Sequence, residues 1–180
     1  MNRKGYLHYI ALILMILILT ACSSGSVSNQ AASRKAGFSD ESIVYINSDE
    51  VALASKAATD ATKKATKEAF DLVNKTRTDA GLKALTWTTD LEQASTVRVV
   101  EASESFSHTR PDGTDWWTVN SDIMYGENLA KGYSTAEDVV KAWIASPTHK
   151  ENIMDKDFTS GAIAIYVCDG VWYWSQEFGY

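Results

Sequence analysis

Apolar residues recur at helical spacing in three segments of the chain. The first segment stops at Ala80-Gly81, a pair that favours the end of a helix. The second runs from a capping box that starts at Thr89 to about Ser103. The third runs from a capping box that starts at Ser134 to the residue before Pro147, which cannot continue a helix. The pattern therefore predicts three amphipathic helices.

Two apolar runs near the end of the sequence have the composition of β-strands, residues 162–168 and 171–178. Asp169-Gly170 lies between them, and this dipeptide favours the type I′ turn of a two-residue hairpin. Trp172, Trp174 and Phe178 recur on one face of the second run, which we expect to pack in the core; a ligand-binding groove is the alternative. Because the helices precede the hairpin, the predicted fold class is α+β, built in layers.

The first 21 residues have the pattern of a bacterial signal peptide. Arg3 and Lys4 precede an unbroken apolar run, Ile10–Leu19, that is too short to cross a bilayer but has the length of a signal-peptide core. Residues 19–22 read Leu-Thr-Ala-Cys and resemble the lipobox of bacterial lipoproteins, which predicts a lipid on Cys22. An ordinary secretory signal, cleaved before an incidental cysteine, is the alternative.

Residues 22–63 are predicted to form a lipidated linker ahead of the globular part of the chain. Residues 23–36 are small and polar, as in a flexible tether. Residues 43–46, Ile-Val-Tyr-Ile, are either a short strand or a peptide that docks on the domain. Asn47 and Glu50 would cap a following helix of marginal stability.

Composition fits one packed domain at residues 64–180, after a signal peptide at 1–21 and the linker at 22–63. Apolar residues make up 45% of the chain and aromatic residues 11%, which excludes a disordered protein. The formal net charge is −6, and no basic cluster follows the signal peptide, so a nucleic-acid partner is not expected. The 2 cysteines are too few for a disulfide framework.

The candidate chemistry outside the signal peptide rests on His108, His149 and Glu127. Two imidazoles and a carboxylate would suit Zn²⁺ with an open coordination position. The histidines lie far apart in the sequence, and no His-Glu-x-x-His motif, nucleophile motif, phosphate loop or Cys-x-x-Cys pair is present. The residues alone therefore leave a second interpretation open, in which the histidines complete loops and caps while Glu127 accepts backbone N–H groups.

A series of motifs, in order, resembles the CAP superfamily, which groups cysteine-rich secretory proteins, insect venom allergens, plant pathogenesis-related proteins and bacterial SCP-like extracellular proteins. About 110 of the 180 residues are covered, and the chain is identified as a member of the bacterial, cysteine-poor branch. The most specific motifs are Phe70-x-x-Val73-Asn74-x-x-Arg77, Phe106-Ser107-His108-x-Arg110-Pro111, Gly126-Glu127-Asn128-Leu129-Ala130, Ser146-Pro147-x-His149-Lys150-x-Asn152 and Tyr173-Trp174-x-Gln176-x-Phe178-Gly179.

The resemblance implies an α-β-α sandwich with a central antiparallel sheet and a cleft lined by histidine and glutamate. His108 and Glu127 match the cleft pattern of the family, and His149 is assigned to the cleft through the bacterial Ser-Pro-x-His motif. The glutamate and the second histidine of the eukaryotic branch are absent. The resemblance thus implies at most a weak site for Zn²⁺ or another divalent cation. The residues it places in the cleft wall are Arg110, Asn128 and Gln176.

Three functions follow as hypotheses. The first is a binding module that palmitate and related lipid on Cys22 anchor to the outer face of the bacterial cell membrane. Its cleft would take a metal, a small ligand or a lipid, or would engage cell-wall or protein partners. The second is a metal-assisted hydrolase of peptides or cell-wall components, with Glu127 as general base. The third is a structural domain whose polar cleft is a hydrogen-bond network.

Overall fold

The structure is a computed structural model that describes residues 49–50 and 58–180. The predicted signal peptide, Cys22, the tether and residues 43–46 lie outside the described residues. Within the described part of the chain, no helix combines the length and the apolar composition needed to span a bilayer.

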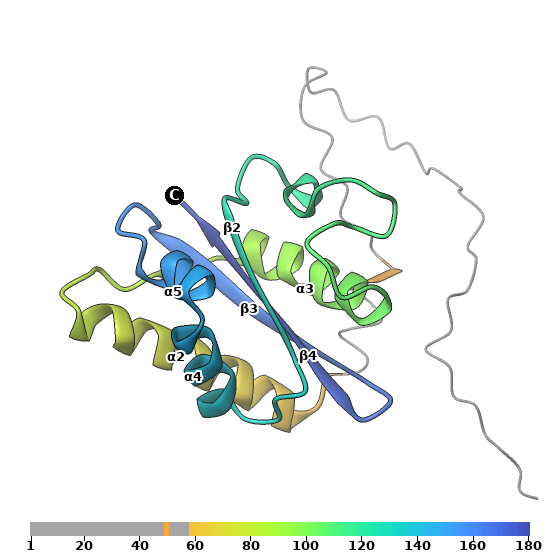
Figure 1. The fold of residues 1–180 in the computed structure, drawn as a ribbon, viewed down its shortest axis with the longest axis horizontal. Helices are drawn as coiled ribbons and strands as arrows, with labels where there is room; N and C mark the ends of the chain where they lie inside the picture. The colour runs from red at the N-terminus through yellow and green to blue at the C-terminus, as the bar shows by residue number, and fades with distance from the viewer. Residues whose placement is uncertain (1–48, 51–57) are drawn as a thin grey trace, which may run out of the picture.

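A four-stranded sheet lies between two layers of helices (Figure 1). The strand order is β1-β3-β4-β2, with elements β1 (Thr86–Trp87), β2 (Gly126–Lys131), β3 (Ser160–Cys168) and β4 (Val171–Gly179). Three helices cover one face: α2 (Asp60–Asp79), α4 (Ala136–Ala145) and α5 (Pro147–Met154). The other face carries α3 (Thr89–Glu104), followed by the short 3₁₀ helix η1 (Trp116–Val119). This α-β-α sandwich confirms the predicted α+β fold.

The sheet is antiparallel across β3, β4 and β2, as expected, whereas the two residues of β1 pair with β3 in parallel. The β3–β4 hairpin turns at Asp169-Gly170, where both residues have positive φ, 49° and 76°. These values match a type I′ turn and confirm the predicted hairpin. Trp174 and Phe178 are fully buried, so their face of β4 is a core face.

The main core lies between the sheet and the α2/α4/α5 layer. Val73 of α2, Trp143 of α4 and Trp174 of β4 are buried in it, and the two indole rings meet edge to face at 6.4 Å. The opposite face of the sheet packs against the apolar side of α3, which buries Leu91 and Val97. Alternate residues along each strand therefore contact different helical layers.

The structure corrects two predicted helix starts by one residue. Thr88 rather than Thr89 caps α3, and Thr135 rather than Ser134 caps α4; each side chain accepts from the backbone N–H three residues later. Glu92 does not close a capping box, because its carboxylate accepts from an indole N–H of β1 at 2.9 Å. Neighbouring hydroxyl residues can all act as caps, and the strand that precedes each helix decides between them.

Arg77 fixes the position of α5, the helix that carries His149. Its guanidinium is fully buried and donates only to backbone carbonyls, those of Lys83, Ile153, Asp155 and Phe158, at 2.8–2.9 Å. Three of these carbonyls belong to the end of α5 and to the turn after it. Arg77 therefore connects α2 to α5 and to the turn after α5 by polar contacts.

Candidate functional site

A pocket with a volume of about 340 Å³ opens at the edge of the sheet beside β2. The loop after α3, the start of η1, the start of β2 and the first turns of α5 surround it. Its lining residues are His108, Trp116, Tyr125, Gly126, Glu127, Thr148, His149, Glu151 and Asn152. The three residues predicted as metal ligands, His108, Glu127 and His149, therefore lie around one cavity.

The loop after α3 folds back on itself and so brings His108 to the pocket. The backbone N–H of Trp116 donates to the His108 carbonyl at 3.1 Å, and an isolated bridge joins Thr109 to Asp115. The reversal between these pairs occurs at Gly113, whose φ of 86° is readily adopted only by glycine. Pro111, Asp112 and Gly113 form the tip of this turn.

Glu127 lies behind His108 and holds its ring. The Oε1 atom of Glu127 accepts from Nδ1 of His108 at 2.7 Å, and Oε2 accepts from Nε of Arg98 at 2.6 Å. The Glu127 side chain is 1% exposed, whereas the His108 side chain is 56% exposed. When His108 donates Nδ1–H to this carboxylate as a neutral imidazole, its lone pair lies on Nε2, where a ligand can use it.

Arg98, on α3, is the centre of the buried charge network. Its guanidinium, fully buried, donates to Glu127, to Glu101 and to the carbonyl of Ser107. Burial lowers the pKa of Arg98, but the hydrogen bonds and charges of the two carboxylates outweigh this and raise that pKa above its ordinary value. The network therefore ties α3, β2 and the His108 loop together.

Arg110 completes the network on the α3 side and does not line the pocket. Its Nη2 atom donates to Glu101 at 2.7 Å and its Nε donates to the same carboxylate at 2.9 Å. Arg110 thus neutralises Glu101, the buried carboxylate of α3, and its contribution to the cleft is indirect.

Glu177 is a buried acid that the sequence analysis missed. It pairs with Glu127 across β4 and β2, so both side chains point to the α3 face. Its Oε1 accepts from Ser175 at 2.7 Å, and its Oε2 has no hydrogen-bond partner among the described residues. Burial, then the charge of Glu127, raise the pKa of Glu177 well above its ordinary value. Along β4 it alternates with Trp174 and Phe178 and so lies on the opposite face of the strand. That face is buried only because α3 covers it, which the sequence pattern does not reveal.

A chain of amides holds the other side of the pocket. Asn128 and Gln176 are fully buried, and the Asn128 amide donates to Gln176 Oε1 and to the His149 carbonyl, both at 3.1 Å. Asn152 donates to the Glu127 carbonyl at 3.1 Å and to Asn128 Oδ1 at 3.0 Å. Two of the three predicted wall residues, Asn128 and Gln176, therefore support the pocket from behind without lining it. Asn152 connects α5 to β2.

His149 faces the same pocket from α5. Its Nδ1 atom is buried and has no hydrogen-bond partner among the described residues. Burial, then the nearby charge of His108, lower the pKa of His149, so the ring is neutral at physiological pH. A neutral imidazole with an unused nitrogen is able to bind a cation or to bond a polar ligand.

In this geometry Glu127 has a different role from His108 and His149, although all three were predicted as metal ligands. No group of three or more His, Cys, Asp or Glu residues within 49–50 and 58–180 is arranged to hold a metal ion. His108 and His149 both line the pocket, whereas both oxygens of Glu127 already accept from Arg98 and His108. Glu127 is therefore placed to orient a ligand-binding histidine rather than to act as a third ligand.

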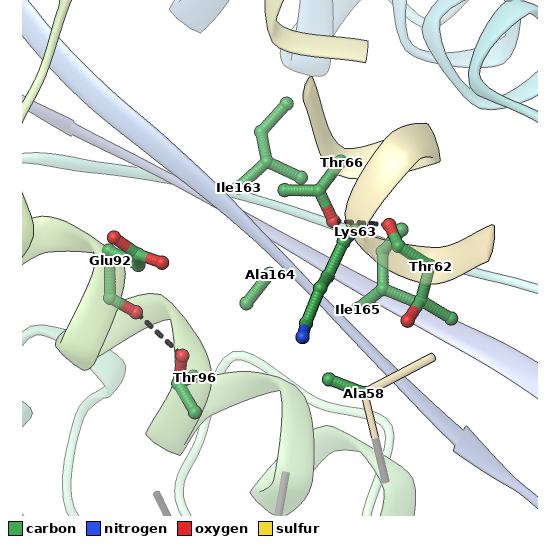
Figure 2. A pocket seen from close by; sticks show the side chains of 9 residues that line it. All are labelled: Ala58, Thr62, Lys63, Thr66, Glu92, Thr96, Ile163, Ala164 and Ile165. Carbon is green, nitrogen blue, oxygen red and sulfur yellow. Dashed lines mark hydrogen bonds between the residues drawn. The ribbon is translucent and has the colours of Figure 1, made fainter. Parts of the chain in front are cut away.

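A second groove, of about 450 Å³, lies at the opposite edge of the sheet, against β3 between α2 and α3 (Figure 2). The hydroxyls of Thr62, Thr66 and Thr96 each donate to a carbonyl of their own chain segment, at 2.8–2.9 Å. Lys63 projects over the floor of the groove from α2 (Figure 2). None of the predicted site residues lines this groove, so the histidine pocket is the candidate site.

Comparison with known sequences identifies a family. The model of the cysteine-rich secretory protein family, CAP, matches residues 70–178. The uncharacterized protein YkwD of Bacillus subtilis strain 168 is 34% identical over 119 residues, which cover 62% of this chain and 46% of the relative. The chain thus spans less than half the length of this relative.

Two solved structures share the fold. An outer surface protein of Borrelia burgdorferi is 24% identical with a TM-score of 0.59, over 66% of this chain and 93% of that one. An extracellular SCP-domain protein of Bacillus anthracis is 22% identical with a TM-score of 0.58, over 66% of this chain and 41% of that one. At these identities the likeness concerns the fold alone.

Proposed function

The chain belongs to the cysteine-rich secretory protein family, and we propose that it is an extracellular binding module whose pocket takes a divalent cation, such as Zn²⁺, and a small polar ligand. The observation that carries the proposal is the convergence of His108 and His149 on one cavity, with Glu127 fixing the ring of His108. The two imidazoles would hold the cation, and oxygen atoms of solvent or ligand would complete its coordination. Two protein ligands imply weak binding.

A binding role suits the position of Glu127 better than a hydrolytic role. A general base must reach the water or substrate from which it takes a proton. The Glu127 side chain is 1% exposed and lies behind His108, so it is a positioning residue here. The pocket is also lined without aliphatic side chains, which favours a polar ligand over a lipid.

The test is calorimetric titration of Zn²⁺ into the mature chain with Cys22→Ser to keep it soluble. His108→Ala and His149→Ala each remove one ligand and should abolish saturable binding. Thr148→Ala alters the same pocket without removing a ring nitrogen and should leave it unchanged. Glu127→Gln should weaken affinity by about tenfold or more, as outer-shell changes at metal sites do.

Zinc binding that survives both histidine substitutions would contradict this proposal, as would its absence in the unsubstituted chain. The second outcome would favour the structural interpretation, for which the fully buried Arg98 network is the specific observation. In that case His108→Ala should lower the melting temperature through loss of the Glu127 contact and alter no binding property.

For location, the proposal is attachment to the outer face of the bacterial cell membrane through a lipid on Cys22. The support is the signal-peptide pattern with its lipobox, together with the fold shared with an outer surface protein and an extracellular protein. Metabolic labelling with palmitate, followed by membrane fractionation, should place label and protein in the membrane fraction. Cys22→Ser should abolish the label and release the protein, and label retained by this variant would contradict the anchor.

A further inference from the structure

We propose that the lip of the histidine pocket is a carbohydrate-binding subsite, in which Tyr125 and Tyr180 stack against the pyranose rings of a glycan. The inference rests on the proposed function in taking the same pocket as a binding site, and it names the class of polar ligand. It does not require the cation.

The rings at this lip are unusually exposed for aromatic side chains next to a polar cavity. Tyr125 lines the pocket and is 48% exposed, and Tyr180 is 64% exposed. Their ring centroids lie 4.5 Å apart and their planes are inclined by 47°, so the two rings form a bent aromatic surface with two adjoining faces. Trp116 adds a further ring to the lining of the pocket. Contiguous exposed apolar surface of this kind is typical of ligand-binding grooves and interaction sites.

The aromatic surface is held by the core. Tyr180 contacts Phe158 at 5.3 Å between ring centroids, and Phe158 stacks on Phe178 at 5.2 Å. Phe158 and Phe178 are both buried. A Cβ atom at Gly126 would lie 2.9 Å from the Phe158 ring, so glycine is what permits this packing. Rings fixed in this way lose little freedom on binding, which favours recognition of a weakly held ligand.

The rest of the pocket has the chemistry that sugar hydroxyls require. Thr148, Glu151 and Asn152 supply hydroxyl, carboxylate and amide groups next to the rings. Asn152 uses its amide N–H groups on β2, at 3.0–3.1 Å, which leaves its oxygen as an acceptor for a ligand. A pyranose ring has an apolar face of C–H groups and a rim of hydroxyls, so it matches flat aromatic surfaces beside polar side chains. An apolar peptide or a lipid would need an aliphatic pocket instead.

The test is titration of the mature Cys22→Ser chain with chitotetraose, an N-acetylglucosamine oligomer, read by tryptophan fluorescence and calorimetry. A parallel arm measures co-sedimentation with purified peptidoglycan, which separates a cell-wall source of the glycan from a free oligosaccharide. Tyr125→Ala and Tyr180→Ala should each weaken binding by about tenfold, the loss expected for one stacking contact. Tyr125→Phe keeps the ring and should retain binding.

The matched control is Tyr133→Ala, because Tyr133 is also exposed, at 37%, and does not line the pocket. It should bind as the unsubstituted chain does. Equal losses of glycan affinity in Tyr133→Ala and Tyr125→Ala would overturn the inference, as would no affinity for either glycan at millimolar concentration. It would also be overturned if a proline-rich peptide, titrated in the same way, bound in a tyrosine-dependent manner while no sugar did. Zinc titration of Tyr180→Ala should remain normal, because Tyr180 does not line the pocket, so failure of the glycan subsite and failure of the cation site are distinguishable.

Discussion

At the scale of single residues, Arg98 is the group on which the candidate site depends. It is fully buried and joins the carboxylates of Glu101 and Glu127 to the loop that carries His108. Buried charges are tolerated only when their partners are in place, because the desolvation cost is otherwise uncompensated. The orientation of His108 is therefore a property of the whole network and not of Glu127 alone.

Arg98→Met tests this dependence. It would leave two buried carboxylates without their shared counter-charge, and we expect the free energy of unfolding to fall by about 3–5 kcal/mol. Urea denaturation of both proteins measures the difference. Lys67→Met removes a cation from an exposed pair with Asp71 and should change nothing measurable. A small effect of Arg98→Met would mean that the carboxylates take up protons or water at little cost.

Glu177 predicts a particular dependence of stability on pH. Its pKa is higher in the folded protein than in the unfolded chain, where it is about 4.3. Between these two pKa values folding takes up a proton, so the free energy of unfolding falls as the pH rises toward the folded pKa. Glu177→Gln lacks this proton uptake. We expect the variant to gain stability relative to the unsubstituted protein as the pH rises from about 5 toward the folded pKa of Glu177.

Denaturation curves collected across that pH range test the Glu177 prediction. Glu137→Gln is the control, since Glu137 lies on the exposed face of α4. Its stability should follow that of the unsubstituted protein at every pH. Parallel curves for Glu177→Gln as well would show that Glu177 is ionised in the folded protein.

At the scale of elements, local sequence accounts for most of the helices and the hairpin. The α2 helix ends where Gly81 takes a φ of 79°, and α4 ends before Pro147, which begins α5. The caps predicted at Thr89 and Ser134 but found at Thr88 and Thr135 show the limit of local sequence preference. Consecutive residues able to cap are equivalent locally, and the path of the preceding chain selects one of them.

Gly170→Ala tests whether the hairpin turn is determined locally. The residue has a φ of 76°, and an added Cβ atom would meet nothing within 4 Å, so the cost is conformational alone. We expect a loss of about 1–2 kcal/mol in the free energy of unfolding. Asp169→Asn should cost nothing measurable, because asparagine also adopts the left-handed region. An unchanged melting temperature in Gly170→Ala would mean that the turn relaxes to another type.

At the scale of the whole molecule, the candidate site exists because two helical layers meet at one edge of the sheet. His108 comes from the loop that follows α3, on one face, and His149 comes from α5, on the other. β2 is the edge strand between them, and its Glu127 and Asn128 point to opposite faces. Layer packing, rather than sequence spacing, sets the distance between the histidines.

The start of the packed domain is a prediction at this scale. α2 begins at Asp60, four residues before the boundary predicted at residue 64, and Thr59 and Thr62 form a reciprocal capping box with Thr62 buried. The free energy of unfolding of a chain that starts at residue 64 should be lower by at least about 1 kcal/mol than that of a chain that starts at residue 58, because the shorter chain lacks the cap. Thermal denaturation of the two chains decides this. Equal stabilities would place the boundary at residue 64.

The sequence by itself determined the elements with strong periodicity, the type I′ turn and the layered α+β class, because these follow from local conformational preferences and from which face is apolar. Through its motifs it also selected His108, Glu127 and His149. Only the tertiary structure decided what these residues do together. Strand register brought Glu177 against Glu127, burial made Arg98 their shared partner, and layer packing put two distant imidazoles on one cavity. Such long-range contacts depend on every element between them, so no local pattern encodes them.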